Sequence, residues 1–235
     1  MTLPVADHRR LHQFWHDPNP PPWVEALSQE WKSFHPGWHY HRFDVHEAID
    51  FMRAEFEPDI HAAFCDIRLP SMVADVFRLA LLLRQGGVYV DMATRCYAPL
   101  EDWLNLREGL VVLRRPHHVP FAASNGFIAT AGPGHPFIAA AWEIVASRIV
   151  RREGVNVGHT TGPRVLRTLF ERSPALFPRY VVEAESIRSM LRIGSSSQHL
   201  PGTQHWSKRQ LVEPLYAPGG IRELFDPPGP LVPSP

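Results

Sequence analysis

Three charged residues in the middle of the chain have types and a spacing that could support chemistry. Asp75 and Arg78 lie three residues apart, and Asp91 follows sixteen residues after Asp75. Residues three apart share a face of a helix, so Asp75 and Arg78 would form a charged pair in an otherwise apolar segment. Carboxylates accept hydrogen bonds from hydroxyl groups, and a planar guanidinium can bind phosphate with paired hydrogen bonds. The pair is therefore either a local ion pair or part of a polar pocket.

The segments around these residues predict how they are positioned. Residues 71–85 have the pattern of a mostly apolar helix, with Ser71 as its N-cap and the glycines at 86–87 as its end. Residues 88–90 then predict a short buried strand that ends at Asp91. In α/β sheets, ligands bind beyond the carboxyl ends of the strands. We therefore expect the helix charges and Asp91 to meet at one such end.

The rest of the chain predicts a single α/β domain over residues 1–225. Strands are expected at 11–15, 38–43, 110–113 and 126–129, and helices at 23–34, 45–52, 136–152 and 163–172. Asp44 is the expected N-cap of the second of these helices. Residues 226–235 are too rich in proline to fold regularly, and we expect a disordered tail.

Composition and charge exclude several classes of function. The 235 residues hold 24 Lys and Arg against 24 Asp and Glu, so the formal net charge is zero and no nucleic-acid partner is expected. No apolar run approaches the roughly 20 residues of a transmembrane helix, and no signal peptide is visible at the start. Cys65 and Cys96 are too few for a disulfide framework. These features predict a cytoplasmic protein with reduced thiols.

The fourteen histidines raise the question of a zinc site. His39 and His41 would share one face of a strand, with His35 and His46 nearby. No partner has the spacing of a known zinc motif, so histidines on the surface or on an edge strand are the interpretation we favour.

A series of fragments, in order, resembles glycosyltransferase family 32. Residues 74–78 and 86–91 resemble its sugar-nucleotide-binding region, and further likenesses occur at 11–15, 31–40, 124–127, 134–136, 161–163 and 204–207. The glucosyltransferase domains of large clostridial toxins are similar over the same stretch. The resemblance implies a GT-A domain, Rossmann-like in its nucleotide half, with a mixed, mostly parallel central sheet flanked by helices. It also implies sugar transfer from a nucleotide donor with retention of configuration.

Carried over onto this sequence, the resemblance implies a donor pocket. Trp15 would stack on the base, or else it is a core residue. Asp75 and Arg78 would hold the transferred sugar and the phosphates, and Asp91 would bind ribose or sugar hydroxyls. Further residues implied in nucleotide or sugar binding are His12, Gln13, Asn125, His205 and Trp206.

The sequence departs from the family at its acidic D-x-D signature, which here is Asp91-Met92-Ala93. The second carboxylate of the signature binds a divalent metal that bridges the diphosphate, and a methyl group cannot replace it. Departure of the nucleotide builds negative charge on a phosphate, which Mg²⁺ or Mn²⁺ ordinarily neutralises.

Three accounts of this departure stay open. Asp91 and His205 could still hold Mn²⁺ or Mg²⁺. Alternatively, Arg95 and Arg78 could supply the positive charge, with Lys208 and Arg209 in reserve. In the third account the protein is a catalytically silent nucleotide-sugar-binding or scaffolding homologue. We favour an active enzyme with Asp75, Arg78, Asp91 and Arg95 as its catalytic residues, acting on a polysaccharide, glycolipid or small-molecule acceptor.

Overall fold

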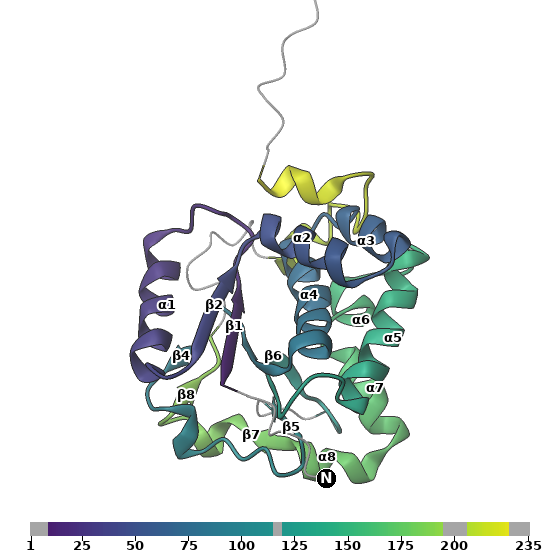
Figure 1. The fold of residues 1–235 in the computed structure, drawn as a ribbon. Helices are drawn as coiled ribbons and strands as arrows, with labels where there is room; N and C mark the ends of the chain where they lie inside the picture. Colours follow the sequence, from purple (N-terminus) through teal and green to yellow (C-terminus); the bar gives the residue numbers. More distant parts are fainter. Residues whose placement is uncertain (1–8, 115–118, 195–205, 226–235) are drawn as a thin grey trace, which may run out of the picture.

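The computed structural model describes residues 9–114, 119–194 and 206–225, which are arranged around one six-stranded sheet (Figure 1). In spatial order its strands are β2 (His39–Phe43), β1 (Arg10–Phe14), β3 (Gly87–Val90), β6 (Ser124–Thr130), β5 (Leu110–Arg114) and β7 (Val181–Glu183). Strand β6 runs antiparallel to β3 and β5, whereas the other neighbours pair in parallel. The expected mixed, mostly parallel sheet is confirmed.

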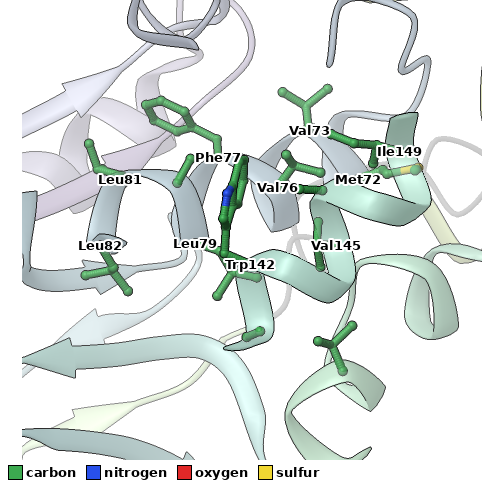
Figure 2. Packing of buried hydrophobic residues seen from close by; sticks show 14 of the residues in the cluster. Met72, Val73, Val76, Phe77, Leu79, Leu81, Leu82, Trp142, Val145 and Ile149 are labelled. Carbon is green, nitrogen blue, oxygen red and sulfur yellow. The ribbon is translucent and has the colours of Figure 1, made fainter. Parts of the chain in front are cut away.

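One face of the sheet carries the larger apolar core. It is covered by α2 (Val45–Glu55), α3 (Pro58–Cys65), α4 (Pro70–Gln85), α5 (Pro136–Val150) and α7 (Arg164–Arg172). Figure 2 shows Met72 and Val76 of α4 close to Val145 and Ile149 of α5. Helix α4 is buried on nearly all sides between this layer and the sheet. Any charged side chain on it must therefore find a partner inside the protein.

The opposite face carries a second core beneath α1 (Pro22–Phe34). Trp31 of α1 is fully buried there, and its Nε1 donates a hydrogen bond of 2.8 Å to the carbonyl of Thr94. A two-stranded ribbon of β4 (Arg95–Cys96) and β8 (Leu191–Arg192) lies next to this helix, together with the 3-10 helices η1 (Leu100–Asp102) and η3 (Ala184–Ile187). In Figure 1, α1 and α4 lie on either side of strands β1 and β2.

Short elements complete the described fold. They are α6 (Val157–Thr160), η2 (Pro174–Leu176), α8 (Phe177–Tyr180), α9 (Trp206–Arg209) and η5 (Gly220–Leu224). Ile221 of η5 is buried in the core that contains α3 and α4, so the chain packs onto this core as far as its last described segment. The predicted tail, 226–235, lies outside the described residues.

Two predicted helix caps have different outcomes. Asp44 caps α2 as expected, because its Oδ1 accepts hydrogen bonds from the backbone N–H groups of His46 and Glu47. The prediction that Ser71 caps α4 is wrong. The N-cap lies two residues earlier, at Leu69, and Pro70 takes the first helical position, where a missing N–H costs nothing.

Within the described ranges, no helix combines the length and apolar character that a membrane span requires.

Candidate functional site

A tight glycine turn joins α4 to β3 and sets the geometry of the site. Gly86 and Gly87 have φ values of +67° and +87°, which favour glycine. A Cβ on Gly86 would lie 2.5 Å from the carbonyl carbon of Gly132, and one on Gly87 would lie 2.6 Å from the carbonyl oxygen of Arg10. The chain reverses at this point, so the first half of α4 lies beside the carboxyl end of β3.

Helix and strand lengths then bring the charged residues level with each other. Arg78 precedes Gly86 by eight residues, a helical rise of about 12 Å, and Asp91 follows Gly87 by four residues, an extended length of about 13 Å. The Nη1 group of Arg78 donates to Asp75 Oδ1 at 2.5 Å, and its Nη2 group donates to Asp91 Oδ1 at 2.6 Å. The expected meeting of the three side chains is therefore present in the structure.

Asp75 forms the buried side of this cluster. Its Oδ1 also accepts a hydrogen bond of 2.7 Å from Asn125 Nδ2, so β6 contributes directly to the site. Its Oδ2 lies 3.4 Å from the hydroxyl of Thr161, which donates to it. Burial raises the pKa of Asp75 to about 6, against the opposing effect of Arg78. Both oxygens accept hydrogen bonds within the protein, and the predicted contact of Asp75 with the transferred sugar stays a prediction.

Asp91 forms the accessible side of the cluster. Its side chain is 42% exposed, whereas that of Arg78 is 3% exposed. The backbone N–H of Asp91 donates to the carbonyl of Gly126 at 2.9 Å, which fixes the strand end against β6. Its Oδ2 has no hydrogen-bond partner among the described residues. Asp91 is therefore the carboxylate of the cluster that can accept a hydrogen bond from a ligand.

Arg78 is turned away from solvent. Its guanidinium lies 4.7 Å from the centre of the Tyr89 ring, and both Nη groups are used by carboxylates. Burial alone would lower the pKa of Arg78. The charge of Asp91, followed by the effects of Tyr89 and Asp75, outweighs burial and raises the pKa above its ordinary value, so the group stays protonated. In this conformation Arg78 holds two acids in place, and its predicted contact with phosphate stays a prediction.

Trp15 lies directly after β1, at the same edge of the sheet. It is half-buried and forms an edge-to-face contact with Trp23, the ring centres being 5.1 Å apart. Both tryptophans pack against a small apolar cluster that includes Met92, the middle residue of the D-M-A triplet. Trp15 is thus a neighbour of the triplet. Both predicted roles, stacking on a nucleotide base and packing in the core, stay predictions.

His12 and Gln13 lie inside the sheet, beneath this edge. His12 Nε2 donates to the carbonyl of Gly86 at 3.1 Å, and burial lowers the pKa of His12 to about 4, so the ring is neutral and supports the glycine turn. Gln13 Oε1 accepts a hydrogen bond from the Tyr40 hydroxyl at 2.8 Å, and its Nε2 is buried with no hydrogen-bond partner among the described residues. Their predicted binding of the donor stays a prediction, because neither side chain reaches the surface in this structure.

Arg95 is held away from the charged cluster by a partner on α1. Its guanidinium contacts Glu30 through Nε and Nη2, with distances of 2.9 and 2.5 Å to Oε2, and the Arg95 side chain is half exposed. The N–H of Cys96 donates to the same carboxylate at 2.7 Å. This arrangement anchors the β4–β8 ribbon to α1, and the positive charge of Arg95 is already balanced.

The C-terminal segment approaches the same edge of the sheet. His205 lies outside the described residues, and Trp206 is described only as the backbone that begins α9. His16 is the residue after Trp15, and burial lowers its pKa to about 4. The charge of Arg209 on α9 also lowers this pKa, which indicates that α9 is near the site. Arg209 itself is paired with Glu213 at 2.8 Å.

The described residues do not by themselves form a metal site. Asp91 supplies one accessible carboxylate, Ala93 supplies no ligand, and nowhere in the described ranges do three His, Cys, Asp or Glu side chains gather as ligands. Two of the histidines considered as zinc ligands have protein partners. His41 Nε2 lies 3.0 Å from the carboxylate of Glu47, and the ring of His35 contacts the carbonyl of Trp31 and accepts a hydrogen bond from the N–H of Leu100.

Sequence reasoning missed three contributors to the site. Tyr89 lies in a run that indicates only a buried strand, yet its ring covers Arg78. Thr161 belongs to a turn noted only for its resemblance, although it contacts Asp75. The adjacent Gly162 is required by packing, since a Cβ there would lie 2.8 Å from Gly158 Cα and 3.2 Å from Asp75 Oδ2. The resemblance of 161–163 was the available signal for the last two.

The sheet order and the helix–turn–strand unit form an α/β domain with an acidic residue at the end of β3. Residues 21–108 match the family described as the glycosyltransferase sugar-binding region containing the DXD motif. The resemblance is thereby confirmed over these residues, in which Ala93 stands in place of the second acid of the motif.

Named relatives and a solved structure agree with this assignment. Inositol phosphoceramide mannosyltransferase 1 of Schizosaccharomyces pombe is 28% identical over 136 residues, 55% of this chain and 40% of that protein. The initiation-specific alpha-1,6-mannosyltransferase of the same yeast is 24% identical over 174 residues, 60% of this chain and 42% of that protein. The chain thus spans about two fifths of the length of these relatives. The structure of the PaToxG glycosyltransferase shares the fold, with a TM-score of 0.53, 18% identity, and coverage of 93% of this chain and 87% of that one.

Proposed function

We propose that this protein transfers a sugar from a nucleotide-sugar donor to an acceptor hydroxyl, with retention of configuration. The single observation that carries the proposal is the exposed Asp91 carboxylate, held by buried Arg78 at the end of β3. A carboxylate fixed in this way accepts hydrogen bonds from sugar hydroxyls without having to reorganise. The match of residues 21–108 to a sugar-binding region supports the same role.

The charge of the cluster favours a sugar over a phosphate at this point. Asp75 and Asp91 carry one more charge than Arg78 balances when both acids are ionised. A surplus of negative charge attracts hydroxyl donors or cations and repels a diphosphate. The diphosphate must therefore be stabilised by other groups. Lys208 is a candidate, because it precedes Arg209 on α9 and makes no ion pair within the described part of the chain.

A retaining transfer does not require a protein base at the cluster. The acceptor hydroxyl would attack on the face from which the nucleotide leaves, and a phosphate oxygen would take its proton. The groups that contact the cluster, Asn125, Thr161 and Tyr89, are an amide and two hydroxyl side chains, and none is a base at neutral pH. Their roles are to orient Asp75 and Arg78.

The acceptor and the metal requirement complete the proposal. We expect a polysaccharide, glycolipid or small-molecule acceptor. Two of the relatives are named as mannosyltransferases, so a mannosyl donor is the first to test. Because Ala93 supplies no ligand, we expect weak binding of Mn²⁺ or Mg²⁺, with Asp91 and His205 as the available side chains.

A cytoplasmic location is supported by Cys65 and Cys96, neither of which forms a disulfide.

The test measures release of nucleoside diphosphate from a panel of nucleotide sugars, with Mn²⁺ and with EDTA. Asp91→Asn should lower turnover about 100-fold, because a preorganised charged contact to the reacting sugar is lost. Asp50→Asn is the matched control, since Asp50 is exposed and paired only with Arg53 on α2. Equal turnover in both variants would show that the site is misassigned.

The second candidate function is a catalytically silent nucleotide-sugar-binding protein, which Ala93 favours. It predicts donor binding, detected as a rise in melting temperature, without release of nucleoside diphosphate under any metal condition. Turnover in EDTA would instead support the active enzyme and the replacement of the metal by cationic side chains.

A further inference from the structure

A polar cavity of about 190 Å³ lies between α5, α6 and α7. Its lining is entirely polar or charged and consists of Arg148, His159, Arg164, Arg167, Thr168 and Glu171. A water molecule occupies roughly 30 Å³ of liquid, so the cavity has room for several waters or for one phosphate group.

The lining has a surplus of positive charge. Three arginines face one carboxylate, that of Glu171, which is already paired with Arg167 at 2.7 Å. Partial loss of solvation, followed by the charges of Arg164 and Arg148, lowers the pKa of His159, which favours the neutral ring. The cavity therefore carries two excess positive charges in a chain whose formal net charge is zero.

The arginines keep unused hydrogen-bond donors. Arg148 spends Nη1 on the carbonyls of His159 and Thr160, at 2.6 and 3.1 Å. Arg164 has one long contact of 3.5 Å, to His159 Nδ1, and Arg167 uses only Nε on Glu171. A guanidinium has five N–H groups, so each of the three side chains keeps donors that no described residue uses and that could bind an anion.

The position of two of these arginines disfavours the fold when no anion is bound. Arg164 is the first residue of α7 and Arg167 lies three residues later, so like charges share a face. The first turn of this helix holds no acidic residue, although the amino end of a helix favours negative charge and disfavours positive charge. A bound anion would remove both unfavourable effects.

We infer that this cavity binds a phosphate-type dianion, either free phosphate or the phosphomonoester group of a larger molecule. Planar guanidinium groups match the oxygens of a phosphate, and the amino end of α7 favours the same charge. The site lies close to the charged cluster, because Arg148 holds the carbonyl of Thr160 and the next residue, Thr161, contacts Asp75. Binding of an anion at this site does not require the protein to transfer a sugar.

The experiment measures binding of inorganic phosphate by calorimetry at constant ionic strength, with chloride as the reference anion. The double variant Arg164→Gln, Arg167→Gln should weaken binding at least about tenfold, since two charge-assisted contacts are lost. Arg172→Gln is the matched control, because Arg172 is an exposed arginine of the same helix outside the cavity, and its binding should be unchanged.

A second measurement separates binding from a structural role. In chloride, Arg164→Gln should leave the melting temperature unchanged or raise it, because repulsion is relieved, and it should reduce the rise that phosphate produces in the wild type. A lower melting temperature in chloride together with an unchanged phosphate effect would mean that Arg164 is structural, and the inference would be overturned.

Two further arms identify the source of the phosphate group. Glycerol 3-phosphate tests a soluble phosphomonoester, and phosphatidylcholine vesicles with and without phosphatidic acid test a lipid headgroup. Binding of any of these probes that is lost in the double variant supports the site and names its ligand. Binding of phosphate no stronger than chloride, or equal loss in Arg172→Gln, refutes it.

Discussion

Gly126 lies against the carboxylate of Asp91 so closely that a Cβ at position 126 would be 2.8 Å from Asp91 Oδ2. Strand β6 can approach the end of β3 at this point only because residue 126 has no side chain. The accessible oxygen of Asp91 is therefore positioned by a glycine as well as by Arg78.

Gly126→Ala should displace the Asp91 side chain and weaken donor binding. We expect the affinity for a nucleotide sugar to fall about tenfold, since a misplaced hydrogen-bonding group loses roughly one charge-assisted contact. Gly37→Ala is a suitable control, because nothing lies within 4 Å of the position that its Cβ would occupy. If both alanine variants bound the donor as the wild type does, Asp91 would not contact it.

Arg78→Ala should destabilise the protein by about 3–5 kcal/mol, because two carboxylates lose their buried partner. Arg53→Ala removes an exposed pair at the same helical spacing, where both side chains are about two thirds exposed, and should cost at most about 1 kcal/mol. Urea unfolding of both variants at neutral pH measures the difference. Similar losses in the two would show that burial of the pair contributes little.

Asp75 should make the stability of the protein depend on pH in an unusual direction. Burial raises its pKa from 3.8 to about 6, so between these values the folded protein holds a proton that the unfolded chain has released. The contribution of Asp75 to the free energy of unfolding therefore falls as the pH rises through this window.

Asp75→Asn removes this titration. The stability of the variant relative to the wild type should increase between about pH 4 and pH 7, as measured by urea unfolding at a series of pH values. A stability difference that stays constant over the whole range would mean that the pKa of Asp75 is not raised.

Ala93→Asp should restore the second acid of the D-x-D signature and tighten Mn²⁺ binding, by at least about tenfold for one added carboxylate ligand. Calorimetry with Mn²⁺ measures the effect. Ala62→Asp, on the exposed side of α3, controls for added charge. Adding Asp91→Asn to Ala93→Asp should abolish the gain, and a gain that survives this change would place the metal elsewhere.

The local parts of the site could be predicted from the sequence because they depend on spacing within one segment. The three-residue spacing of Asp75 and Arg78, the glycine pair and the short strand before Asp91 all lie within residues 75–91. Helix and strand geometry then makes the three side chains level with one another.

Contacts between distant segments could not be predicted in this way. Glu30 pairs with Arg95 across 65 residues, and this pairing joins Arg95 to α1 in the described fold. The predicted catalytic role of Arg95 stays a prediction. Thr161 reaches Asp75 across 86 residues. The start of α4 was misplaced for a local reason, since the fixed φ of Pro70 begins the helix before Ser71 can cap it.

The turn at Gly86 and Gly87 also fixes an angular phase between α4 and β3. Each residue added to a helix rotates the positions before it by about 100° relative to those after it. An insertion between Arg78 and Gly86 would swing the guanidinium toward the apolar layer of α5, leaving Asp91 without its counter-charge. Homologues of this chain should therefore tolerate insertions in surface loops far more readily than a change in the length of this helix.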